Sequence, residues 1–150
     1  MVCLGNICRS PVAEGVMRKI AEEEGLSVLV DSAGTSNYHI GENPDRRSAM
    51  NAKKNGIDIS MLKARQFTKD DFFEFDYILV MDESNYQNVV KLAPNQELVS
   101  KVDFLLNKIY PKQNLPVPDP YFGKEDGFEE VFQLVTKACK AFSEELKHHF

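Results

Sequence analysis

Cys3 and Arg9, near the start of the chain, are the residues whose types and spacing could best do chemistry. The segment between them lies where a strand is expected to end and a helix to begin. Its successive backbone N–H groups can therefore surround one anion, and the positive end of the helix adds to the attraction. Gly5 and Asn6 tolerate left-handed backbone conformations, which we expect of a loop that turns its amides inward. The segment predicts an anion-binding loop.

Phosphate is the anion that suits this loop best, because the planar guanidinium of Arg9 can bind two phosphate oxygens in parallel. The loop amides would also stabilise the thiolate form of Cys3, which is the nucleophilic form of cysteine. Ser10 either donates its hydroxyl hydrogen to this sulfur or only caps the helix. We expect Cys3 to attack phosphorus while Arg9 and the loop hold the phosphate. The remaining phosphate-binding residues would be Leu4, Gly5, Asn6, Ile7, Cys8 and Ser10.

A general acid is needed if the leaving group is as poor as a phenolate, whose oxygen must be protonated as it departs. Asp119 is the best candidate, since Pro118 and Pro120 on either side favour a stiff, extended loop. An Asp-Pro pair by itself is most often only a turn element. As an acid, Asp119 would later take a proton from the water that attacks a thiol-phosphate intermediate.

Helical and strand-like patterns alternate along the rest of the chain. Helices are expected at residues 10–24, 44–55, 69–75, 84–92 and 127–149, strands at 26–31 and 77–81, and either type at 97–105. This alternation favours an α/β fold with a parallel sheet covered on both faces. In such sheets ligands bind at the carboxyl ends of the strands, where the loop after the first strand would lie.

The first strand is the weak point of this fold prediction. Only Met1 and Val2 precede Cys3, whereas a strand usually has about five residues. We therefore expect a first strand that is unusually short or that begins before residue 1.

The composition indicates one domain over residues 1–150 that binds neither nucleic acid nor membrane. Of the 150 residues 43% are hydrophobic, enough for one core, and the net charge of −5 provides no overall basic field for anionic partners. No apolar run reaches the roughly 18 residues of a membrane span, and no signal-peptide pattern opens the chain. Three irregularly spaced cysteines are compatible with a reducing compartment, so a cytoplasmic protein is expected. Without metal-ligand spacing, we expect neither metal nor another cofactor.

The anion-binding loop is part of a longer motif, VCLGNICRSP at residues 2–11, followed by Ala13 and Glu14. This motif resembles the signature of low-molecular-weight protein tyrosine phosphatases. The resemblance continues through DSAGT at 31–35, ARQ at 64–66, MDESN at 81–85 and DPYFG at 119–123. It implies a single domain with a four-stranded parallel sheet flanked by helices. It also implies hydrolysis of phosphotyrosine through a cysteinyl-phosphate intermediate, with Cys3 as nucleophile and Asp119 as general acid and base.

The substrate implied by the resemblance is a phosphotyrosine-containing protein or an aryl phosphate. Tyr38, Tyr121 and Phe122 fall where the family places aromatic walls around the substrate ring. Two departures from the family pattern are visible. Family members commonly carry a histidine before the ARQ motif that helps to hold the loop asparagine, whereas residues 61–63 here are MLK, so the support of Asn6 is expected to differ. The second aromatic residue after the Asp-Pro pair is Phe122, which cannot be phosphorylated.

Cys8 has two possible roles. It lies on the same loop as Cys3 and would convert a sulfenic acid on Cys3 into a reversible disulfide. The alternative is a buried thiol that only fills space.

Related proteins provide the competing interpretations. Arsenate reductases of the same fold need further cysteines, but Cys139, the only candidate beyond Cys8, falls on the apolar face of the last helix and is expected to be a core thiol. Protein arginine phosphatases tend to have threonine where this chain has Ile7, and the bulkier apolar residue favours phosphotyrosine. A phosphopeptide-binding module would lose the nucleophile or the acid. A thiol phosphocarrier of a sugar transport system would lack Arg9 in this setting.

Overall fold

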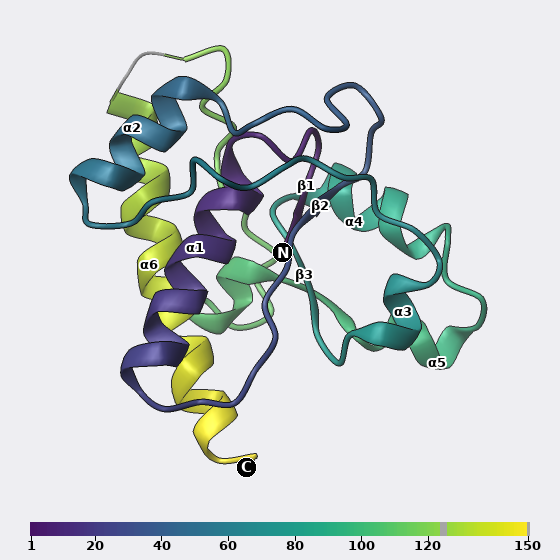
Figure 1. Ribbon diagram of the computed structural model, residues 1–150. Helices are drawn as coiled ribbons and strands as arrows, with labels where there is room; N and C mark the ends of the chain where they lie inside the picture. Colours follow the sequence, from purple (N-terminus) through teal and green to yellow (C-terminus); the bar gives the residue numbers. More distant parts are fainter. Residues whose placement is uncertain (124–125, 150) are drawn as a thin grey trace.

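One parallel sheet organises the computed structural model, which describes residues 1–123 and 126–149 (Figure 1). Its strands are β1 (Val2–Cys3), β2 (Ala33–Gly34), β3 (Ile78–Val80) and β4 (Val102–Phe104), arranged in the order β2, β1, β3, β4. All three neighbouring pairs are parallel. The loops that follow the strands therefore meet at one edge of the sheet.

Helices cover both faces of this sheet. They are α1 (Arg9–Glu23), α2 (Arg46–Lys54), α3 (Asp71–Glu74), α4 (Glu83–Val90), α5 (Gln96–Val99) and α6 (Asp126–Lys147), with a 3₁₀ turn η1 at Leu105–Lys108. Figure 1 shows α1, α2 and α6 on one side of the strands and α3, α4 and α5 on the other. No helix in the described ranges combines the length and the apolar character that crossing a bilayer requires.

The alternation of side chains along the strands creates a separate core on each face. Cys3 and Leu79 belong to the core beneath α1 and α6. Val2, Ile78 and Val80 belong to the core on the opposite face. Successive residues of a strand point to opposite faces, so β1 and β3, with two and three residues, each contribute to both cores. The expected α/β fold with a four-stranded parallel sheet is confirmed.

The expected helices and the strand at 77–81 are present, with boundaries shifted by a few residues. The ambiguous segment 97–105 contains both types, since α5 is followed directly by β4. The strand expected at 26–31 is wrong, because β2 lies two residues beyond it, at Ala33–Gly34.

The error in β2 has a physical cause. A strand exists only where a neighbour pairs with it, and β1 pairs with Ala33 and Gly34 through Val2 and Cys3. The preceding apolar run is not fully buried, since Leu29 is 79% exposed while Val28 packs against the core. The run therefore precedes the residues that pair with β1, and its composition alone does not define a strand.

Candidate active site

The segment after β1 turns back onto Cys3. Asn6 has a φ of 57°, in the expected left-handed region, and its backbone N–H donates to Cys3 Sγ at 3.3 Å. α1 then begins at Arg9 with Cys8 as N-cap, so Ser10 lies inside the helix and does not cap it. The Ser10 hydroxyl is 3.0 Å from Cys3 Sγ. Of the two roles considered for Ser10, contact with the sulfur is the one observed.

Two glycines have little space around them for a side chain, and at Gly34 the close neighbours are backbone atoms. Gly5 has no positive φ, so the left-handed conformation expected for it is wrong. A Cβ on Gly5 would instead lie 3.0 Å from His39 Cδ2. A Cβ on Gly34, in β2, would lie 2.8 Å from the Leu4 carbonyl oxygen. The loop therefore packs directly on the backbone of β2, a role of Gly34 that the sequence analysis missed.

Asn6 connects Cys3 to a chain of buried polar groups. Asn6 Nδ2 donates to Ser10 Oγ at 2.8 Å and to Ser32 Oγ at 3.0 Å, which uses both amide hydrogens. Ser32 Oγ donates in turn to Glu14 Oε1 at 2.6 Å. Because Ser10 Oγ already accepts from Asn6, its own hydrogen can go to Cys3 Sγ at 3.0 Å, which is nearer than a backbone carbonyl at 3.5 Å. This order of donors stabilises negative charge on the sulfur.

The Asn6 side chain has its polar atoms bonded without a histidine. Asn6 Oδ1 accepts from the backbone N–H of Arg65 at 3.0 Å. The Arg65 guanidinium is fixed by Asp31 at 3.1 Å and by Asp71 at 3.0 Å. Leu62, from the segment where the family has its histidine, packs against the hydrophobic core. Hydroxyl groups and one backbone amide therefore support Asn6 in this chain.

The Arg9 guanidinium is buried, and two groups near the end of the neighbouring strand β3 hold it in place. Its Nη1 donates to Asp82 Oδ2 at 2.7 Å and to the Val117 carbonyl at 3.0 Å. Asp82 follows β3 and also caps α4 by accepting from the Asn85 N–H. Asp82 was not predicted as the partner of Arg9. Its position directly after a buried strand was the available signal.

Asp119 lies beside Arg9. Asp119 Oδ2 is 3.4 Å from Arg9 Nη2, and Asp119 Oδ1 accepts from the Tyr121 N–H at 3.0 Å. The chain just before Asp119 is fixed to the sheet, because the Val117 N–H donates to the carbonyl of Met81, just after β3, at 2.8 Å. The fold thus brings Cys3, Arg9 and Asp119 to one edge of the sheet, although Asp119 is more than a hundred residues from the other two.

This arrangement has close counterparts among known proteins. A sequence model described as "Low molecular weight phosphotyrosine protein phosphatase" matches residues 1–150. The human protein of that name is 47% identical over 146 residues, which cover 95% of this chain and 91% of the human one. The chain belongs to this family.

Solved structures agree with the family assignment. A protein tyrosine phosphatase from Entamoeba histolytica matches with a TM-score of 0.92 at 36% identity, covering 99% of this chain and 95% of the other. A Drosophila arginine phosphatase matches with a TM-score of 0.89 at 30% identity, covering 97% of this chain and 95% of the other. The expected membership in the low-molecular-weight phosphatase family is confirmed.

The aromatic residues expected around the phosphatase site differ in placement. Tyr121, two residues after Asp119, lies 4.8 Å from Phe122 and 6.5 Å from His39 between ring centroids. Phe122 is 92% exposed and Tyr38 is 73% exposed. The structure therefore brings Tyr121 to the site and leaves the other two rings largely in solvent. His39, to which the sequence analysis gave no role, contacts this group.

The two remaining cysteines are buried thiols. Burial, followed by the nearby Asp45 carboxylate, raises the pKa of Cys8 well above its usual value. Cys8 packs with Ile7, Ala64 and Phe128. Burial also raises the pKa of Cys139 to about 12, and this cysteine lies in the core beneath α1 and α6, as expected. Its sulfur lies 3.9 Å from the Ala13 carbonyl oxygen of α1, so Cys139 packs as a core residue.

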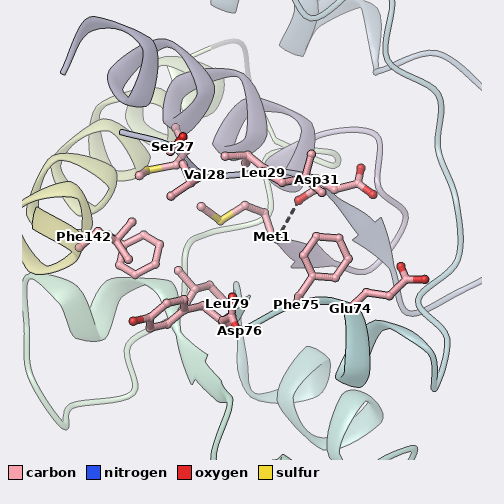
Figure 2. A pocket seen from close by; sticks show the side chains of 14 residues that line it. Met1, Ser27, Val28, Leu29, Asp31, Glu74, Phe75, Asp76, Leu79 and Phe142 are labelled. Atoms are coloured by element: carbon pink, nitrogen blue, oxygen red, sulfur yellow. Dashed lines mark hydrogen bonds between the residues drawn. The ribbon is translucent and has the colours of Figure 1, made fainter. Parts of the chain in front are cut away.

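A hollow of about 250 Å³ lies away from the loop after β1, at the amino ends of the strands (Figure 2). The Met1 side chain projects into it near Val28 and Leu79, and the Met1 amino group donates to the Asp31 carbonyl at 3.1 Å. Among the described residues, its lining includes three carboxylate side chains and the Met1 amino group, but no Lys, Arg or His side chain. Since carboxylates repel phosphate, this hollow does not suit a phosphorylated substrate.

Proposed function

We propose that residues 1–150 act as one phosphatase domain that hydrolyses phosphotyrosine in proteins through a phosphorylated Cys3. The observation that carries this proposal is the convergence of a thiol, a buried guanidinium and a carboxylate where β1 and β3 end. Family membership supports the same activity. The substrate would be a phosphotyrosine-containing protein or a simpler aryl phosphate.

The first step transfers the phosphoryl group to the enzyme. Cys3 Sγ attacks phosphorus, the sulfur–phosphorus bond forms, and the bond to the tyrosine oxygen breaks. Asp119 donates its proton to that oxygen, so tyrosine leaves as a neutral phenol. Arg9 Nη1 is already bonded to Asp82 and to the Val117 carbonyl. The edge formed by Nε and Nη2 is therefore the one that would bind two phosphate oxygens.

The second step releases phosphate. Water attacks the phosphorus, and the Asp119 carboxylate accepts the water proton. Cys3 leaves as a thiolate, which the Ser10 hydroxyl and the Asn6 N–H would stabilise, since these groups lie 3.0 Å and 3.3 Å from the sulfur. The loop amides and Arg9 would hold the three remaining oxygens of the phosphoryl group in both steps.

The structural match to a Drosophila arginine phosphatase makes phosphoarginine the alternative substrate to test. The purified protein is assayed for turnover of a phosphotyrosine peptide, a phosphoarginine peptide and arsenate. We expect kcat/KM for phosphotyrosine to exceed that for phosphoarginine by at least about tenfold, with no arsenate reduction. A higher kcat/KM for phosphoarginine would replace the proposed substrate, and thiol-dependent arsenate reduction would replace the reaction.

We also propose that Cys8 protects Cys3 from irreversible oxidation. Hydrogen peroxide would oxidise the Cys3 thiolate to a sulfenic acid, and Cys8 would attack its sulfur, release water and form a disulfide that a dithiol reduces. Peroxide should inactivate the enzyme, and dithiothreitol should restore it much less completely in Cys8→Ser than in the wild type. Equal recovery in the two proteins would rule this role out.

The raised pKa of Cys8 adds a pH dependence to this prediction. A thiol usually has a pKa above 7, so raising the pKa of Cys8 keeps its thiol protonated at neutral pH, whereas the attacking form is the thiolate. The rate of disulfide formation should therefore increase as pH rises from about 6 to about 9, by up to about tenfold per pH unit. The reason is that the thiolate fraction of Cys8 grows in that proportion at pH values well below its pKa. Quenching at timed intervals and counting free thiols by mass spectrometry measures this rate.

A further inference from the structure

Arg47, in the first turn of α2, contacts three separate parts of the chain. Its guanidinium binds Asp45 in bidentate fashion, with Nε 3.2 Å from Oδ1 and Nη2 3.0 Å from Oδ2. Nη2 also donates to the Tyr121 carbonyl at 3.0 Å. The guanidinium carbon lies 4.8 Å from the Phe128 ring centroid, at the start of α6, and 5.7 Å from that of Tyr121. Arg47 therefore joins α2 to the turn that carries Asp119 and to α6.

The α2 end of this contact is itself fixed to the phosphate-binding loop. Asp45 caps α2 by accepting from the Arg47 N–H, and the Asp45 N–H donates to the Ile7 carbonyl at 2.7 Å. Ser48, one turn along, donates its hydroxyl to the Cys8 carbonyl at 3.0 Å. The first turn of α2 is thus held to the loop through two backbone carbonyls.

The other end of the contact acts on the carboxylate of Asp119. The backbone of Tyr121 makes two hydrogen bonds. Its N–H donates to Asp119 Oδ1, and its carbonyl accepts from Arg47 Nη2. The turn is closed by the Gly123 N–H, which donates to the Pro120 carbonyl at 3.0 Å. A displacement of Tyr121 would move the hydrogen bond that orients the Asp119 carboxyl group.

We propose that Arg47 is a positioning residue for the general acid, holding the Asp119 turn at a fixed place above the loop. This proposal rests on the proposed role of Asp119. Arg47 does not touch the reacting atoms. It acts through Tyr121, and its bidentate pair with Asp45 provides a rigid base. A planar guanidinium can serve Asp45, the Tyr121 carbonyl and the aromatic rings at once, which an ammonium cannot.

The test compares Arg47→Met and Arg47→Lys with a matched control, Arg46→Met, which alters the exposed neighbour on the same helix. Single-turnover rates of enzyme phosphorylation are measured for aryl phosphates whose phenols span a range of pKa. Arg47→Met should slow phosphotyrosine by roughly 10- to 100-fold, because a misplaced acid transfers its proton poorly. The loss should shrink to a few-fold for the most acidic phenols, which leave with little help. Arg47→Lys should fall between Arg47→Met and the wild type.

Two further measurements separate this role from a general effect on the fold. Vanadate affinity, which reports on the phosphate-binding loop, should stay within about twofold of the wild type in Arg47→Met. Melting temperatures identify a variant that does not fold, and Arg47→Lys then provides the leaving-group comparison. An unchanged rate in Arg47→Met, or one lowered equally for every phenol, would overturn the proposal.

Asp119→Asn serves as the reference variant in the same series of measurements. If the loss of rate in Asp119→Asn is the same for every phenol, Asp119 is not the acid, and the Arg47 proposal fails with it. If the loss of rate varies with the phenol in Asp119→Asn but is the same for every phenol in Arg47→Met, the Arg47 proposal alone has failed.

Discussion

Cys3→Ser is expected to abolish hydrolysis of phosphotyrosine and to leave vanadate binding intact. An alcohol is a far weaker nucleophile than a thiolate, so turnover should fall by roughly 10³-fold or more. The groups that would bind the phosphate are untouched by this change, since Arg9 is anchored by Asp82 and Val117 and not by Cys3. Steady-state turnover and vanadate titration, each on the purified variant, measure the two effects.

Cys8→Ser is the matched control for this experiment, because it removes a thiol from the same loop without removing the proposed nucleophile. Its turnover under reducing conditions should remain within a few-fold of the wild type. If Cys3→Ser retains more than about a tenth of wild-type turnover, Cys3 is not the nucleophile. Loss of vanadate binding in Cys3→Ser would show instead that the loop has collapsed.

Asp119→Asn should slow hydrolysis of phosphotyrosine by roughly 10²- to 10⁴-fold, the usual contribution of a positioned general acid. The deficit should shrink for aryl phosphates with more acidic phenols, because these phenols leave as anions with little help. The rate of intermediate formation should therefore depend steeply on the pKa of the leaving phenol in the variant and only weakly in the wild type. Single-turnover measurement isolates this step from the attack of water, in which Asp119 also takes part.

Asp82→Asn provides the contrast for Asp119→Asn. Asp82 is bound to Arg9 at 2.7 Å and caps α4, so its removal should disturb phosphate binding. We expect Asp82→Asn to lower the rate by a similar factor for every phenol. Equal slopes in Asp119→Asn and the wild type would mean that Asp119 is a structural turn residue. A steep slope in Asp82→Asn would then identify Asp82 as the acid.

The sequence by itself determined the parts of this protein that depend on residues close together in the chain. The loop from Cys3 to Ser10 is one continuous segment, so its residue types could be interpreted without knowing what surrounds it. The same holds for α6, whose apolar residues recur at helical spacing over 22 residues. Asp119 was also chosen as the candidate acid from local features, namely the two prolines beside it and the motif that they share.

Only the tertiary structure decided which distant residues complete the site. Asp82 meets Arg9 because β1 and β3 are parallel neighbours and the residues that follow them lie at the same edge. Ser32 and Gly34 meet the loop because β2 pairs with β1. The same pairing explains why β2 lies beyond the apolar run at 28–30. Arg47 reaches the Asp119 turn from a helix more than seventy residues earlier in the chain. Each of these contacts depends on the pairing order of the strands and the docking of helices on them. That order is fixed by the burial of the whole sheet and not by the residues on either side of any one position.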